Sequence, residues 1–225
     1  QPHVQRQDAG LRAEAEQRFA AALAQREMLV KEVHHRIKNN LQGVAGLLQQ
    51  NAARHPELAV ILSESVGQVQ AIAQVYGLQV GAGGPLRVAS VVEAIALSVQ
   101  RTFGRPVQVD QGTAEVAAFL LPEAEAIPIA LTINELMTNA IKHSVQADVR
   151  CALSCREDEV QLQIRNAGQL REGFSLTQFP GGVSGLGLVR ALLPRRSASF
   201  DLRQDADTVL AEMVLKAPSV VREAG

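Results

Sequence analysis

Apolar residues in the first third of the chain recur with helical spacing. Residues 11–52 contain no proline and are rich in Ala, Leu, Gln, Glu and Arg, which predicts one long helix. The second half of this helix carries an apolar seam whose steps of four and three are typical of a helix packed against another. The seam consists of Val30, Ile37, Leu41, Val44 and Leu48.

A second apolar stripe begins after the break NAARHP (51–56), where Pro56 suits the first turn of a new helix. This stripe consists of Leu58, Leu62, Val66, Val69, Ile72 and Tyr76. Two helices with a short connection predict an antiparallel hairpin. Because one hairpin buries only part of its apolar surface, we expect two copies of the chain to complete a dimeric four-helix bundle.

Beyond the glycine-rich segment GAGGP (81–85), helical spacing alternates with the two-residue spacing of strands. Helices are predicted within 90–103, 122–144 and 185–193. Strands are predicted at 107–110, 148–155, 159–165, 199–204 and 208–215, the last four as two antiparallel hairpins. This order predicts an α+β layer, in which helices cover one mostly antiparallel sheet.

Composition narrows the class of protein. Apolar residues make up 47% of 225, enough for a core in one large or two small domains. The 22 Lys and Arg nearly balance the 23 Asp and Glu, which argues against a nucleic-acid binder. Two cysteines are too few for a disulfide framework, so we expect a cytoplasmic protein. No apolar run approaches a membrane span, and the chain begins at Gln1, so we expect membrane attachment only through a segment upstream.

Two adjacent histidines lie in the first predicted helix, in EVHHRIKNNLQ (32–42). At about 100° per residue, His34 falls beside the apolar seam and His35 nearly opposite it. We therefore expect His34 to be half-buried and hydrogen-bonded, and His35 to face solvent. Glu32 and Asn39 share the outward face with His35. An exposed histidine alone is usually only a solvated residue, so a chemical role for His35 needs a reaction partner elsewhere.

Three motifs in order supply that partner: HHRIKNNLQ, NELMTNAIKHS and GLGLVRALL. Together they resemble sensor histidine kinases, specifically the HWE-type relatives whose phosphoacceptor box reads H-R-x-K-N. The resemblance implies a dimeric hairpin that carries the phosphorylated histidine, followed by an ATP-binding domain of the GHKL (Bergerat) fold. The family's acceptor precedes Arg-x-Lys-Asn, which is His35 here. The implied organisation is a signalling helix at 1–28, the hairpin at 29–80, a linker at 81–86, the ATP-binding domain at 87–217 and a tail at 218–225.

NELMTNAIKHS places three polar side chains on one helical face, since Glu135, Asn139 and Lys142 are four and three residues apart. The resemblance implies that Asn139 is the Mg²⁺ ligand and that Glu135 orients or deprotonates the attacking histidine. Lys142 is placed to neutralise phosphate charge. The alternative is an amphipathic helix with a solvated polar face, and the apolar positions of this segment are compatible with both interpretations.

Glycines before the helix at 185–193 allow the backbone to approach phosphates, so Gly185 and Gly187 are assigned to phosphate binding. Residues 169–184 would form a lid over ATP, with Gly181 and Gly182 as its hinge. The family's Asp-x-Gly-x-Gly motif departs here to Asn166-Ala167-Gly168-Gln169-Leu170. Asn166 can still accept the adenine amino hydrogen bond, but without a charge, and Gly168 keeps the first glycine.

The resulting hypothesis is a kinase core that transfers phosphate from ATP–Mg²⁺ to His35 and then to an aspartate of a response regulator receiver domain. Asn39 would orient a water for a reverse phosphatase reaction, and Glu32 would hold the imidazole tautomer. One alternative is a degenerate adaptor that binds partners through the hairpin, which the Asn166 variant favours. A GHKL serine kinase of the anti-sigma type would explain the ATP motifs but not HHRIKNN.

Overall fold

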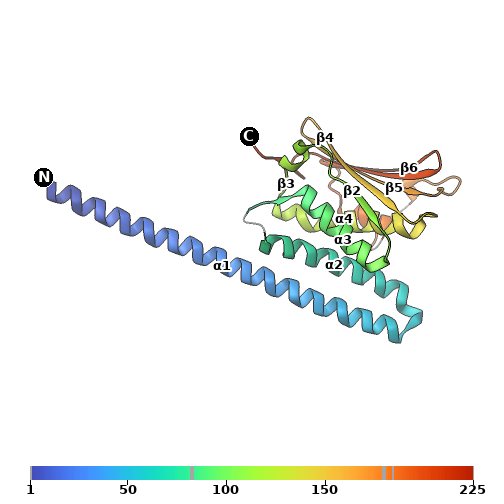
Figure 1. The fold of residues 1–225 in the computed structure, drawn as a ribbon, viewed down its shortest axis with the longest axis horizontal. Helices are drawn as coiled ribbons and strands as arrows, with labels where there is room; N and C mark the ends of the chain where they lie inside the picture. The colour runs from blue at the N-terminus through green and yellow to red at the C-terminus, as the bar shows by residue number, and fades with distance from the viewer. Residues whose placement is uncertain (1, 82–83, 179–180, 184, 225) are drawn as a thin grey trace.

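The structure is a computed structural model that describes residues 2–81, 84–178, 181–183 and 185–224. Its longest element is the helix α1 (Pro2–Arg54). It contains the predicted helix and continues past Gly10, because a single glycine weakens a helix without ending it. A turn of 3₁₀ helix, η1 (Pro56–Leu58), leads into α2 (Ala59–Gly81) and begins with Pro56 as predicted. Figure 1 shows α1 and α2 as an antiparallel hairpin, with the N-terminal half of α1 projecting beyond the rest of the molecule.

The inner face of this hairpin differs in part from the predicted seam. Ile37, Leu41 and Leu48 are half-buried, but Val30 and Val44 are 44% and 45% exposed. The fully buried residue of α1 is Ala45, one position beyond Val44. A small side chain at the contact lets two helix backbones approach closely, so the helix turns Ala45 inward in place of the bulkier Val44.

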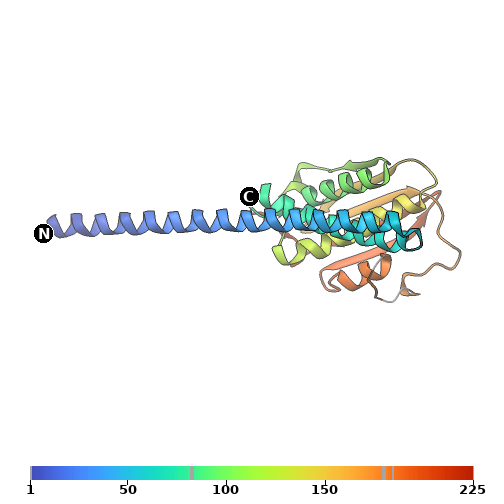
Figure 2. The same cartoon turned by 90° about the horizontal axis from the view of Figure 1, so that it is seen from below.

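The rest of the chain forms an α/β domain (residues 86–222) around a five-stranded sheet. Its helices are α3 (Val88–Phe103), α4 (Glu123–His143) and α5 (Gly185–Leu192), with 3₁₀ turns η2 (Ala114–Ala118) and η3 (Leu176–Gln178). The sheet consists of β2 (Val107–Asp110), β4 (Val149–Arg156), β5 (Glu159–Ala167), β6 (Ala198–Asp205) and β7 (Thr208–Leu215). The strand order is β2-β4-β5-β7-β6, with β2 parallel to β4 and the other pairs antiparallel. Both predicted strand hairpins and the α+β class are confirmed, and the helices cover one face of the sheet (Figures 1 and 2).

A second, three-stranded sheet was not anticipated. It pairs β3 (Phe119–Leu121) with β1 (Leu86–Arg87) on one side and β8 (Val221–Arg222) on the other. Strands of two or three residues are too short to show a period in the sequence. The residues assigned to a tail therefore include β8, and Ser219 of that segment donates or accepts a buried hydrogen bond with Ser197 at 2.7 Å.

Helix α2 packs on both the hairpin and the α/β domain. It lies against α1 on one side and against α3 and α4 on the other (Figure 1). Ala71 and Val75 of α2 are buried in the same core as Ile95 of α3 and Ile133 of α4. The two parts predicted as hairpin and ATP-binding domain therefore share one continuous core, although residues 82–83 of the predicted linker lie outside the described residues.

Among the described residues, the helical stretch Pro56–Gly81 is long and apolar enough, by length and composition alone, to cross a membrane. Glu57, Glu64 and several glutamines interrupt its apolar residues, so the sequence shows no unbroken apolar run here. This stretch packs against α1, α3 and α4, and 22% of its apolar window is buried within the chain.

Candidate functional site

The two histidines of α1 face in different directions, as predicted. His35 is exposed, and His34 is half-buried with its ring edge-on to Tyr76 of α2, the ring centroids 5.4 Å apart. The prediction that His34 is hydrogen-bonded is wrong, because its buried Nδ1 has no partner among the described residues. The aromatic contact with Tyr76 positions the ring in its place.

The surroundings of His35 come from its own helix. Its Nδ1 lies 3.4 Å from Asn39 Nδ2, one turn further along α1. Glu32 is bonded to Arg36, whose Nε donates to Glu32 Oε1 at 2.7 Å, and this hydrogen bond lowers the pKa of the Glu32 carboxyl. Glu32 is therefore engaged by Arg36 and does not hold the imidazole, as had been expected from its spacing.

Glu135 is the best-connected polar residue of α4. It is buried, and its two carboxylate oxygens accept separate hydrogen bonds. The Gly185 N–H donates to Oε2 at 2.9 Å, and Gln68 Nε2 of α2 donates to Oε1 at 3.1 Å. Desolvation raises the pKa of Glu135, and the two hydrogen bonds oppose that shift. The structure thus brings together Glu135 and Gly185, which were predicted from separate motifs.

Asn139 and Lys142 follow Glu135 along α4. Asn139 is half-buried, and its side chain has no hydrogen-bond partner in the described part of the chain. Lys142 Nζ lies 3.6 Å from Glu64 Oε1 of α2. An amide oxygen with free lone pairs suits Mg²⁺, which takes few protein ligands and completes its shell with water and phosphate. The donor set therefore fits ATP–Mg²⁺, and the described residues contain no cluster of three His, Cys, Asp or Glu as an alternative metal site.

The end of β5 carries the variant glycine motif. Asn166 is buried and its Nδ2 donates to the Ala167 carbonyl at 3.3 Å. Gly168 lies against the C-terminal end of α4, where a Cβ would stand 3.0 Å from the His143 carbonyl oxygen. Any side chain there would push α4 away from the sheet, so Gly168 has a packing role in addition to its predicted one.

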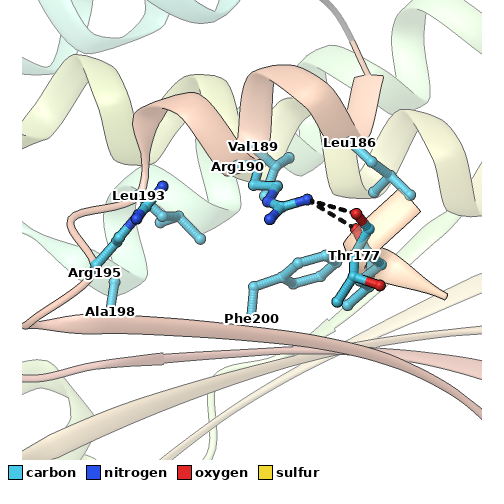
Figure 3. A pocket seen from close by; sticks show the side chains of 9 residues that line it. Thr177, Leu186, Val189, Arg190, Leu193, Arg195, Ala198 and Phe200 are labelled. Atoms are coloured by element: carbon cyan, nitrogen blue, oxygen red, sulfur yellow. Dashed lines mark hydrogen bonds between the residues drawn. The ribbon is translucent and has the colours of Figure 1, made fainter. Parts of the chain in front are cut away.

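The segment predicted as a lid is anchored to α5. Arg190 Nη1 donates to the carbonyl oxygens of Leu176 and Thr177 in η3, at 3.3 and 3.2 Å (Figure 3). Beneath this contact, a pocket of about 300 Å³ is lined by apolar side chains that include Phe200 of β6. Residues 179, 180 and 184 of the predicted lid lie outside the described residues. Gly182, one of its predicted hinge residues, approaches Gly187, whose Cα would lie 3.7 Å from a Cβ at 182.

The predicted site residues fall into two groups. Glu135, Asn139 and Lys142 lie on α4 with Gly185 at the start of α5, whereas His35 and Asn39 lie on α1. Helix α2 lies between α1 and α4 (Figure 1), and no hydrogen bond or ion pair joins His35 to the α/β domain among the described residues. Gln68, which bonds to Glu135, was missed because a polar residue on a helix ordinarily indicates a solvated face.

A helical hairpin followed by a mixed sheet with helices on one face is the architecture of histidine kinase cores. The histidine kinase domain of the blue-light activated histidine kinase EL346 of Erythrobacter litoralis has this fold, with a TM-score of 0.57 and 19% sequence identity over 84% of this chain and 91% of that one. A larger structure of the same kinase superimposes with a TM-score of 0.53 and 20% identity, over 78% of this chain and 59% of that one.

Sequence relatives narrow the class further. Residues 32–100 match the model of the family HisKA_2, described as histidine kinase. The chain is 30% identical over 211 residues to the sensor histidine kinase PdtaS of Mycobacterium tuberculosis, and 29% identical over 217 residues to PdtaS of Mycolicibacterium smegmatis. These alignments cover 88% and 91% of this chain but only 40% and 42% of the relatives, so the chain spans less than half of their length. The chain is therefore similar to sensor histidine kinases over most of its own length, and its segment 32–100 matches the HisKA_2 family.

Proposed function

We propose that this chain is the kinase core of a two-component sensor. It transfers the γ-phosphoryl group of ATP to His35 and passes it to an aspartate on the receiver domain of a response regulator. The observation that carries this proposal is the hydrogen bond between the Gly185 N–H and Glu135, because it joins the acidic residue of one kinase motif to the glycine motif of another at 2.9 Å.

Each polar group at this site has a role in holding the substrate. The backbone N–H groups of Gly185 and Gly187 bind phosphate oxygens at the start of α5, where the helix dipole also favours negative charge. Asn139 would hold Mg²⁺, which supplies charge neutralisation on the transferred phosphate. Lys142 adds a second positive charge one turn along α4. Asn166 accepts a hydrogen bond from the adenine amino group, and Gly168 keeps the backbone close beside it.

His35 acts as the nucleophile in its neutral form. The bond formed joins a ring nitrogen to phosphorus, the bond broken releases ADP, and the remaining ring proton must leave. Asn39 orients the ring. With its amide oxygen and nitrogen exchanged by a flip, the oxygen accepts a hydrogen bond from Nδ1–H and leaves the Nε2 lone pair free to attack. Glu135 is buried and its pKa is raised by desolvation, which makes its carboxylate a better proton acceptor than a solvated one.

The reaction requires His35 to reach a site from which α2 now separates it. Either the hairpin shifts relative to the α/β domain or a second copy delivers its own His35. A second copy is supported by large apolar side chains that α1 leaves exposed. They include Leu29 at 59%, Val33 at 53% and Leu47 at 62%. Covering these residues in a homodimer would complete the four-helix bundle. We place this core in the cytoplasm, with any membrane attachment through a segment outside this chain.

Labelling with γ-³²P ATP tests the proposal. The unsubstituted chain should acquire an acid-labile, base-stable label, as a phosphohistidine does, and His35→Gln should lose it. His34→Gln is the matched control, since it removes the neighbouring ring that packs on Tyr76, and it should keep the label. Label that persists in His35→Gln but disappears in His34→Gln would overturn the assignment.

A further inference from the structure

Helix α2 makes direct contact with the groups of the proposed nucleotide site. The side-chain amide of Gln68 donates to Glu135 Oε1 at 3.1 Å and to the Val183 carbonyl oxygen at 3.0 Å. These acceptors lie on the two sides of the site, one on α4 and the other in the segment just before α5. A few residues earlier in α2, Glu64 holds Lys142. The hairpin therefore engages Glu135 and Lys142, both of which the proposed function assigns to catalysis or phosphate binding.

We propose that Gln68 is a latch that couples docking of the hairpin to an empty nucleotide site. This inference rests on the proposed function, since it takes Gly185 and Glu135 as groups of the ATP site. In the latched state Gln68 ties α2 to α4 and to residue 183, and occupation of the site by ATP releases it.

The coupling follows from competition for one donor. The Gly185 N–H at the start of α5 now donates to Glu135, an anion of the protein itself. A phosphate group is also an anion and needs the same N–H. Because one N–H donates to one strong acceptor at a time, phosphate binding displaces the Glu135 carboxylate from Gly185. Val183 and Glu135 must then move relative to each other, and Gln68 cannot keep both of its acceptors.

The same competition affects the neighbouring ion pair. Lys142 is more than one-third exposed and lies 3.6 Å from Glu64, so the pair is a weak contact that phosphate charge can replace. Loss of both contacts removes these polar links between α2 and α4 and leaves only the apolar core that the two helices share, which weakens the docking of the hairpin. Release of these links lets the hairpin move His35, which in the latched state has no hydrogen bond or ion pair with the α/β domain among the described residues.

Because ATP binding and the contacts of Gln68 are thermodynamically linked, the latch can be tested by measuring ATP affinity alone. If ATP binding breaks the contacts of Gln68 with Glu135 and Val183, then removing those contacts must tighten ATP binding by the same factor. Gln68→Ala is therefore expected to bind Mg²⁺–ATP about fivefold or more tightly than the unsubstituted chain, the lower end of typical coupling factors. The matched control is Gln70→Ala, the same change two residues along α2, where the glutamine accepts from Thr102 of α3 at 3.3 Å and not from the site. Its affinity should be unchanged.

Hydrogen exchange of α2 backbone amides provides a second readout that does not depend on phosphorylation. Saturating ATP should accelerate exchange in α2 of the unsubstituted chain, and Gln68→Ala should show this faster exchange without nucleotide. If Gln68→Ala folds poorly, as judged by circular dichroism, Gln68→Met replaces it, because a methionine side chain is of similar length, adds no charge and has no N–H to donate to Glu135 or Val183. If the unsubstituted chain binds ATP and these variants bind it with unchanged or weaker affinity, the latch is wrong but the proposed function stands. No ATP binding by the unsubstituted chain overturns the proposed function and the latch with it.

Discussion

His35 and Glu135, the two residues on which the proposed chemistry depends, are held in opposite ways. His35 is exposed, and its one side-chain hydrogen-bond partner among the described residues, Asn39, is four residues away on the same helix. Glu135 is buried, and its partners Gln68 and Gly185 are 67 and 50 residues away in the sequence. The acceptor is positioned by local helix geometry, whereas the carboxylate is positioned by tertiary packing.

This difference matches what each group must do. A histidine that takes a phosphoryl group from one domain and gives it to another protein has to remain accessible to both. A carboxylate that accepts a proton in the proposed reaction has to be withdrawn from water, because desolvation is what raises its pKa. A substitution at a position held by its own helix and one at a position held by tertiary packing should therefore differ in the size of their effects and in the property that they change.

The largest expected difference is in activity. Glu135→Ala should reduce the initial rate of autophosphorylation by about 10²–10⁴-fold, the range for loss of a positioned acid or base. Asn39→Ala should reduce it by less than about tenfold, since Asn39 touches only the exposed ring, while it slows loss of phosphate from His35. Rates with labelled ATP at matched protein concentration measure both. Equal losses in the two variants would contradict the distinction between the sites.

The next difference is in stability, and two methionines provide a matched pair. Met137 of α4 is fully buried, and Met137→Ala should lower the free energy of unfolding by about 2–5 kcal/mol through loss of packing and the cavity left behind. Met28 of α1 is 71% exposed, and Met28→Ala should change it by no more than about 0.5 kcal/mol. Urea denaturation followed by circular dichroism gives both values. A loss at Met28 as large as that at Met137 would show that Met28 is buried in solution.

Alanine substitutions at two glycines should change the stability of the fold in opposite directions. Gly112 follows β2 with a φ of 67°, and a Cβ there would lie 2.2 Å from the Leu153 carbonyl oxygen, so Gly112→Ala should destabilise the fold by about 1–3 kcal/mol. Gly43 lies within α1 with nothing within 4 Å of its Cβ position. Gly43→Ala should stabilise the helix by about 0.5–1 kcal/mol. Thermal unfolding of the two variants is the measurement, and shifts of the same sign would be inconsistent with the structure.

The smallest effect is in the pH dependence of stability. Burial raises the pKa of Glu135 above 4.5, so between 4.5 and that raised value the folded chain binds more protons than the unfolded one. The contribution of Glu135 to stability is therefore lost as the pH rises through this window. Glu212 has the opposite pH dependence. Its pKa is lowered, first by the hydrogen bond from Gln163, so its contribution to stability is lost as the pH falls below 4.5.

Unfolding free energies measured from pH 3 to 8 test these signs. Glu135→Gln should remove a downward slope with rising pH, and Glu212→Gln should remove an upward one. A Glu135→Gln profile parallel to that of the unsubstituted chain would mean that this carboxylate is solvated in the folded protein.

Much of the secondary structure was predictable because it depends on near neighbours. The helix of His35, the strand hairpins and the helix that carries Glu135 all follow from apolar spacing over one or two turns. The inner face of α1 was predicted only in part, because Ala45 and not Val44 is buried. Spacing cannot distinguish the two adjacent positions, since the partner helix selects the side chain that permits the closest approach.

The sequence by itself determined which residues can do chemistry and, for His35, which way the side chain faces, since both depend on residue type and helix phase. Only the tertiary structure decided what meets Glu135. The backbone of Gly185 and the amide of Gln68 arrive from elements that are distant in the chain, and backbone donors carry no signature in a sequence. The docking of α2 on α4, the short strand β8 and the glycine contact at His143 have the same origin. Each is a contact between distant segments, and the residue pattern of one segment does not show which other segment it contacts.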